Sequence, residues 1–312
     1  MLSRVAENLY WMARYVERAE NTARMVSVNG HLQLDLPARA KTGWEPLVEI
    51  IGGASLFRRL YRSASERNVV AFLVTDDRNP GSIISSLRAA REKARTMRDL
   101  LPREAWEQIS SLYAVASQRI RKGELRPDRD QYLRTVVLGA QTCTGLLAGT
   151  MSHDVGYEFL KTGRNLERAD MTSRIIDVRS ADLLPAHDSG LRPFETIQWM
   201  SVLKSLSAYQ MYRQHVDKSV RRVPVLEYLL KDEEFPRALF HCLGEIEGCL
   251  KALPRSGAAL RVITRLRRTV AAADIESLEQ RHLNEFLDRL QVMLGDLNDR
   301  IRETYFRPVP GA

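Results

Sequence analysis

The chain has 312 residues, of which 44% are hydrophobic and 28% are charged, a composition typical of a globular protein that can bury a sizeable core. Its formal net charge of +8 favours anionic partners in general, but the arginines are interleaved with acids and no module of aromatic and basic residues recurs, so nucleic acid is a disfavoured partner. The three scattered cysteines fit a reduced, cytoplasmic setting better than a secreted disulfide framework.

The first helix is predicted to begin at the N-terminus. Residues 1–8 lead directly into an amphipathic helix, without the apolar run of a signal peptide, and no stretch of about 18 apolar residues predicts a membrane span. Asn29 and Gly30 predict the end of this helix, since glycine is common just after a helix C-terminus. Its core-facing stripe comprises Val5, Leu9, Met12, Val16, Ala19 and Ala23.

Residues 44–63 are predicted to form a second helix, and an apolar run over 69–74 follows it. The run is rich in β-branched residues and is compatible with a strand when taken alone. It stands isolated among helices, so we predict a short buried helix instead.

The next group of candidate site residues comprises Asp76, Asp77, Arg78 and Asn79. Asn79 is suited to be a helix N-cap, with Pro80 at the first helical position. Polar groups at a helix N-terminus can alternatively shape an anion site. Capping explains the group without a ligand, and the anion site remains the alternative.

The rest of the chain also has helical periodicity. A loop over 185–190 and a frayed tail over 307–312 are expected, and no strand pairs, glycine-rich phosphate loop or long linker interrupt the pattern. The sequence therefore predicts an all-α helical bundle packed as one body. The expected helices are 82–100, 103–122, 130–149, 151–180, 193–220, 235–253, 258–272 and 275–306.

A charged motif occurs twice, with every position shifted by 150 residues and one conservative change from Glu to Asp. A second pair of matching segments, 69–80 and 225–236, is shifted by 156 residues. We therefore predict an internal duplication, with halves at 1–150 and 151–312. The charged positions of the two motifs are Arg14, Glu17, Arg18, Glu20 and Arg24, and Arg164, Glu167, Arg168, Asp170 and Arg174.

These residues also carry a resemblance to a known family. The chain resembles the bacterial alpha-E family over nearly its whole length. The segments that carry the resemblance are Asn8-Leu9-Tyr10-Trp11 with Glu17-Arg18-Ala19-Glu20, and Phe159-Leu160 through Glu167-Arg168-Ala169-Asp170. The resemblance implies an all-helical protein whose relatives occur alongside circularly permuted ATP-grasp proteins and transglutaminase-like proteases, in presumed peptide-modification systems.

The charged positions of the motifs allow three interpretations. In the structural one, Glu17 and Glu167 are buried carboxylates paired with arginines, because a buried charge is costly unless it is paired. In the binding one, the motifs line a groove in which Arg14, Arg18, Arg164 or Arg168 take the carboxylates of a peptide and the glutamates take an amine. In the third, the same charges serve acid/base chemistry on amide bonds.

Metal and nucleophile signals are weak. Glu279 and His282 form a single Glu-x-x-His on a predicted helix, whereas a di-iron bundle needs the motif twice and two further glutamates. The other histidines have no metal-ligand spacing and no nucleophile motif beside them. We therefore predict surface residues, no metal and no cofactor.

The sequence thus predicts a binding or scaffold component of a peptide-modification system, with an amide-bond enzyme as the alternative. The partners implied are an ATP-grasp-type ligase, a transglutaminase-like protein and a peptide or other anionic ligand, without membrane contact. The two motif helices should be neighbours, since a duplicated unit commonly packs against its copy.

Overall fold

The computed structural model describes residues 3–37, 40–121, 128–181 and 192–307. The predicted loop over 185–190 and nearly all of the predicted tail lie outside these residues. Within them the chain forms fourteen α-helices and one π-helical segment and contains no strand, so the prediction of an all-α fold is confirmed. No helix in these ranges is long and apolar enough to span a bilayer.

The elements up to residue 150 are α1 (Ser3–Asp35), α2 (Glu45–Ile50), α3 (Ala54–Leu60), α4 (Glu66–Val70), η2 (Ala71–Thr75), α5 (Ile83–Arg95), α6 (Arg103–Arg121) and α7 (Arg129–Thr150). The others are α8 (Val155–Ala181), α9 (Arg192–Ser205), α10 (Tyr209–His215), α11 (Arg222–Lys231), α12 (Leu239–Ala252), α13 (Gly257–Ala271) and α14 (Gln280–Tyr305).

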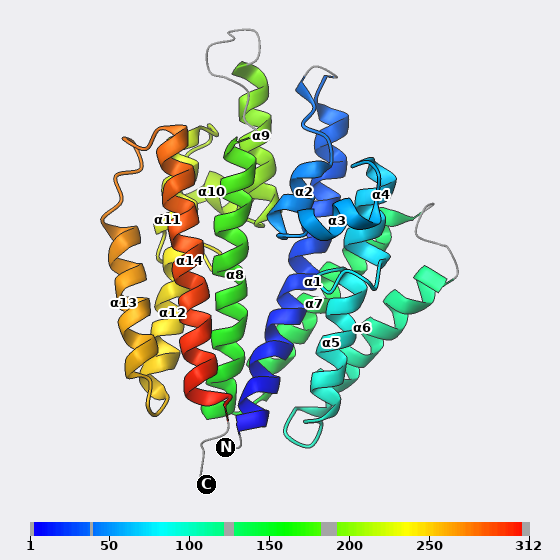
Figure 1. Ribbon diagram of the computed structural model, residues 1–312, viewed down its shortest axis with the longest axis vertical. Coiled ribbons are helices and arrows are strands. Elements are labelled where there is room, and N and C mark those ends of the chain that lie inside the picture. Colours follow the sequence, from blue (N-terminus) through cyan, green and yellow to red (C-terminus); the bar gives the residue numbers. More distant parts are fainter. Residues whose placement is uncertain (1–2, 38–39, 122–127, 182–191, 308–312) are drawn as a thin grey trace.

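Helices α1 and α8 carry the two charged motifs and lie side by side in the middle of the molecule (Figure 1). Helices α5 and α7 pack against α1, and α12 and α14 pack against α8. The expected contact between the motif helices is therefore confirmed. The apolar stripe of α1 faces the core as predicted, with Leu9, Met12 and Ala19 fully buried.

The two central helices lie in close backbone contact at Gly163 of α8. A Cβ atom built on Gly163 would lie 2.3 Å from the backbone carbonyl oxygen of Tyr10 on α1. Only glycine allows this crossing, because the atom that a methyl group would meet belongs to the backbone and cannot rotate away.

The predicted end of the first helix at Asn29 and Gly30 is wrong, since α1 continues to Asp35. The Asn29 side chain is buried, accepts a hydrogen bond from Arg179 Nη2 at 2.7 Å and donates one to the carbonyl of Gly43 at 3.2 Å. Tertiary contacts thus extend the helix past a local stop signal.

Two long predicted helices are interrupted by residues in the left-handed region. The predicted helix 44–63 breaks into α2 and α3 at Gly52, whose φ is +68°. Similarly, the predicted helix 193–220 breaks into α9 and α10 at Ser207, with φ +56°. An α-helix requires a negative φ at every residue, so neither helix can continue.

The apolar run 69–74 is helical, as predicted, and lies within α4 and η2. The prediction that Asn79 caps the next helix is wrong, because α5 begins at Ile83 and its N-cap is Ser82, whose hydroxyl accepts from Ser85 N–H at 3.2 Å. Asn79 instead secures the preceding turn: its amide donates to the carbonyl of Phe72 at 2.9 Å.

Several other helix boundaries differ from the prediction by a few residues. Helix α5 ends at Arg95 rather than 100, and α14 begins at Gln280 rather than 275. Helix α8 begins at Val155 rather than 151, since Asp154 Oδ1 accepts from the backbone N–H of Gly156 at 2.8 Å and starts the first turn there.

Candidate functional site

The second motif glutamate, Glu167 on α8, is bound by two arginines of α1. Arg14 Nε donates to Oε2 at 2.7 Å, and Arg18 donates to Oε1 through Nε at 2.6 Å and to Oε2 through Nη2 at 3.0 Å. The glutamate is 1% exposed. Burial alone would raise its pKa, but the charges and hydrogen bonds of Arg18 and Arg14 outweigh burial and lower the pKa to about 2.

The first motif glutamate, Glu17 on α1, is bound in the reciprocal direction. Arg168 Nε of α8 donates to Oε2 at 3.0 Å, and Arg237 Nη1 donates to Oε1 at 2.6 Å. Arg237 also donates to Asn21 Oδ1 at 2.7 Å and, through Nη2, to Glu20 Oε1 at 2.7 Å. Burial would raise the pKa of Glu17, and the charges of Arg168 and Arg237 lower it instead.

Glu167→Gln is expected to remove a pH-dependent part of the stability. Because the folded pKa of about 2 lies below the ordinary value of 4.5, ionised Glu167 stabilises the fold above about pH 4.5 and this contribution is lost as the pH falls toward 2. The difference corresponds to about 3 kcal/mol. Urea unfolding between pH 3 and 7 should therefore give a shallower pH dependence for Glu167→Gln than for the wild type.

Glu285→Gln is the control for this measurement, since Glu285 pairs with Arg281 on the surface and is 56% exposed. It should keep the wild-type pH dependence. A wild-type slope in Glu167→Gln as well would contradict the lowered pKa.

Arg14 is fixed on both sides of its guanidinium. Its Nη1 donates to Asn298 Oδ1 of α14 at 2.8 Å and lies 3.3 Å from the hydroxyl of Tyr10, which itself donates to Asn298 at 2.8 Å. The guanidinium carbon lies 4.8 Å from the centre of the Trp11 ring. The arginine is thereby held rigidly against Glu167.

A cavity of about 260 Å³ lies beside this network, between α1, α8, the end of α2 and the turn before α5. Three of its charged lining residues are partly exposed: the side chain of Arg174 to 33%, that of Arg18 to 25% and that of Asp170 to 23%. Asp170 Oδ2 accepts from Arg174 Nε at 3.0 Å. The lining residues are Arg14, Arg18, Ile50, Ile51, Gly81, Glu167, Asp170, Met171 and Arg174.

Half of the predicted motif positions thus meet at the cavity: Arg14, Arg18, Glu167, Asp170 and Arg174. The others do not line it. Arg168 pairs with Glu17, Glu20 accepts from Arg24 at 2.8 Å as well as from Arg237, and the Nε of Arg164 is buried without a hydrogen-bond partner.

The predicted group 76–79 is an internally paired turn. Arg78 donates to Asp76 Oδ2 at 2.7 Å, and Tyr61 donates to the same oxygen at 2.7 Å. The hydrogen bonds from Arg78 and Tyr61 hold the pKa of Asp76 at about 2, against the effect of burial. Asp77 is exposed. None of the four residues lines the cavity, although the nearby Gly81 does.

Sequence reasoning missed Arg237, which makes three hydrogen bonds in the network. It is 7% exposed and lies in the turn before α12, outside both motifs. The available signal was its place directly after the matched segment: it follows Pro236, as Gly81 follows Pro80.

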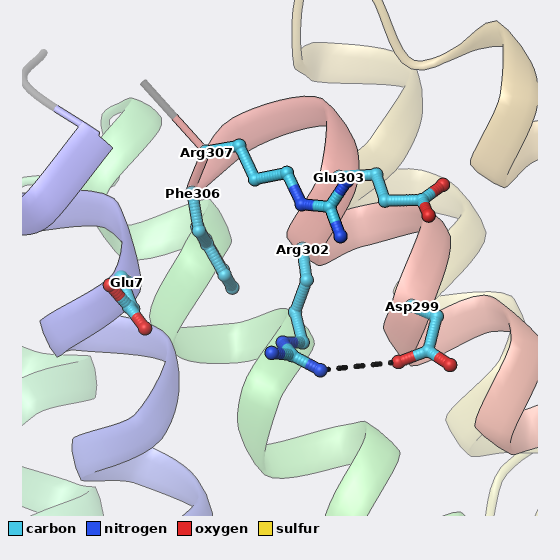
Figure 2. A pocket seen from close by; sticks show the side chains of 6 residues that line it. All are labelled: Glu7, Asp299, Arg302, Glu303, Phe306 and Arg307. Atoms are coloured by element: carbon cyan, nitrogen blue, oxygen red, sulfur yellow. Dashed lines mark hydrogen bonds and ion pairs between the residues drawn. The ribbon is translucent and has the colours of Figure 1, made fainter.

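A second cavity, also of about 260 Å³, lies near the end of α14. Figure 2 shows Glu7 of α1 on one side and the other lining residues on the opposite side: Asp299, Arg302, Glu303, Phe306 and Arg307. The ion pair between Arg302 and Asp299 measures 3.4 Å, and both side chains are more than half exposed. Its charged groups are solvated, so the candidate site is the cavity beside Glu167.

Glu279 and His282 are exposed, as expected of surface residues. Among the residues described there is no group of histidine, cysteine and acidic side chains able to hold a metal. Cys143, Cys242 and Cys249 are buried free thiols, and burial raises the pKa of each to about 12, so they are not nucleophiles.

Comparison with known proteins gives a consistent result. The model of the Alpha-E family, described as a predicted alpha-helical domain with a conserved ER motif, matches residues 1–306. Uncharacterised proteins of Mycobacterium bovis and Mycobacterium tuberculosis are 23% identical over 96% of this chain, which spans 36% of their length. No solved structure matches. The chain belongs to the Alpha-E family.

Proposed function

We propose that this chain is a binding component whose cavity beside Glu167 takes an ionic group of a peptide or amino acid. The observation that carries the proposal is the composition of the cavity, in which rigidly held arginines and carboxylates adjoin open space. Arginine binds carboxylates through two parallel N–H groups, and a carboxylate receives an amine or guanidinium. Such a set suits the charged ends of a peptide.

Binding is favoured over acid/base catalysis by the state of the two motif glutamates. Their pKa values are lowered by arginines, so at neutral pH neither carries a proton to donate. As bases they are weak, because a carboxylate whose pKa is lowered has little affinity for a further proton.

We also propose that the binding component works within a peptide-modification system, beside an ATP-grasp-type ligase and a transglutaminase-like protein. The resemblance to the alpha-E family motivates this step. The mycobacterial relatives, in which the matched region is 36% of the length, offer support because the region there is joined to much further chain. An arrangement of that kind suits a module that presents a ligand to neighbouring domains.

An internal duplication with halves at 1–150 and 151–312 belongs to the same proposal. It is supported by three similarities of the halves: the reciprocal pairing of Glu17 and Glu167, the helix breaks at Gly52 and Ser207, and the equal length of α3 and α10. A duplicated unit would have given two sites, of which one is now filled by Arg237.

The binding proposal is tested by calorimetric titration with short acidic, basic and zwitterionic peptides. Arg174→Lys should weaken peptide binding roughly tenfold, because the charge is kept but the Nε–H donor that fixes Asp170 is lost. Arg281→Lys is the matched control, since Arg281 forms an i,i+4 pair of the same 3.0 Å length far from the cavity. Failure of every peptide to bind would overturn the proposal.

A further inference from the structure

The turn before α5 and the turn before α12 share two hydrogen bonds. A side-chain oxygen of Asp76 accepts from the backbone N–H two residues later at 3.0 Å, and Asp232 does the same at 2.9 Å. The last residue of each turn donates its N–H to the carbonyl three residues earlier, at 3.1 and 2.9 Å. Equivalent positions differ by 156, so Gly81 occupies the place that corresponds to Arg237.

Arg237 extends from its turn across to α1. Its guanidinium is held by the carboxylates of Glu17 and Glu20 and by the amide oxygen of Asn21, all within 2.7 Å. The two carboxylates are three residues apart and therefore lie on one face of the helix. The site is completely filled by the protein's own side chain.

Gly81 faces the equivalent part of α8 and offers no side chain. The positions of α8 that correspond to the three acceptors are Glu167, Asp170 and Met171, and all three line the cavity together with Gly81. The space that a long side chain fills at one place is thus open at the other. Its volume of about 260 Å³ would hold roughly eight water molecules at about 30 Å³ each.

We propose that this cavity binds the guanidinium group of a ligand, such as an arginine side chain of a peptide, as Glu17 and Glu20 bind Arg237. Glu167 and Asp170 are the acceptors, and the ligand enters past Arg174. The hydrogen bond from Arg174 engages Oδ2 of Asp170, so Oδ1 can take an N–H group of the ligand.

The arginines around the cavity are each paired with one of its two carboxylates. Arg14 and Arg18 are both bound to Glu167, and Arg174 is bound to Asp170. The carboxylates that hold Arg237 are also paired with other arginines, yet the guanidinium of Arg237 is retained among them. An anion would find these arginines already paired and would lie against the two carboxylates as well.

A guanidinium fits these acceptors better than an ammonium does. Two carboxylates on successive turns of a helix need two N–H groups pointing in fixed, divergent directions, and the planar fork of arginine supplies them. Arg237 uses Nη1 for one carboxylate and Nη2 for the other. An ammonium is a compact charge without this preset direction.

The inference rests on the proposed binding function and is tested with three probes: N-acetylarginine amide, N-acetyllysine amide and N-acetylglutamate amide. We expect calorimetry to give the tightest binding for the arginine probe. Asp170→Asn should weaken it roughly tenfold to a hundredfold, the loss expected for one hydrogen bond to a charged group. The surface variant Glu285→Gln should leave it unchanged.

Gly81→Arg provides the guanidinium from within the chain. It should abolish binding of the arginine probe and raise Tm by roughly 2 °C or more relative to Gly81→Ala. The alanine variant is the control for the backbone, because any Cβ at this position lies 3.3 Å from Asn79 Oδ1. Gly81→Ala should still bind the probe.

The possible failures are distinct. Tighter binding of the glutamate probe, lost in Arg174→Lys, would overturn the guanidinium assignment and leave the proposed function standing. Equal binding of the arginine and lysine probes would also overturn the assignment. Unchanged binding of the arginine probe to Gly81→Arg would mean that the ligand lies elsewhere. If none of the probes or peptides binds, both proposals fail.

Discussion

Arg237→Ala is expected to lower the free energy of unfolding by about 3–5 kcal/mol, the cost of breaking a buried ion pair by removing one partner. The substitution deletes three hydrogen bonds and leaves Glu17 and Glu20 with one fewer cation each while they remain 1% exposed. Urea unfolding at pH 7, monitored by circular dichroism, measures the effect.

Arg221→Ala is the control, because Arg221 pairs with Asp217 at 3.1 Å and is 69% exposed. Its loss should change the stability by at most about 1 kcal/mol. If Arg237→Ala is no more destabilising than Arg221→Ala, then the network around Glu17 does not stabilise the fold as described.

The second large effect is expected for Gly163→Ala. Since the added methyl group would lie 2.3 Å from the carbonyl oxygen of Tyr10, α1 and α8 must move apart, at a cost of about 1–3 kcal/mol for an overpacked core. The displacement should also lengthen the ion pairs between the two helices, which adds to the loss. Thermal unfolding by scanning calorimetry gives the change in Tm.

Gly248→Ala provides the comparison within the same protein. Gly248 lies in α12, and no atom is within 4 Å of a Cβ built there, so alanine should stabilise the helix by up to about 1 kcal/mol. Equal Tm values for the two variants would show that the crossing of α1 and α8 tolerates a side chain.

The sequence predicted the all-α fold and the contact between the motif helices because both depend on repeated patterns. Helical periodicity is a local signal, and a duplicated charged face indicates a partner face. The burial of Glu17 and Glu167 was one of the stated alternatives, and it agrees with their exposure of 1%. Neither pattern indicates which arginine pairs with which glutamate.

The features that were missed depend on contacts between distant residues or on single backbone angles. Arg237 lies 220 residues after Glu17, and an isolated arginine after a proline has no local signature. Asn29 and Gly30 form a common stop signal that tertiary packing overrides. Ser207 adopts a positive φ that serine rarely takes. Gly52 belongs to a Gly-Gly pair, a common turn signal that the prediction of an unbroken helix over 44–63 left unused.

The reciprocal pairing of α1 and α8 affects how the chain can fold during its synthesis. Glu17 receives Arg168 only after about 150 further residues have left the ribosome, and Arg237 arrives later still. Until then the charged face of α1 stays hydrated, and the central crossing cannot form. Closing loops of this length makes the assembly step slow relative to the formation of individual helices. An early pause in translation would thus leave α1 and its neighbouring helices without α8 and Arg237, which complete the buried network of charges.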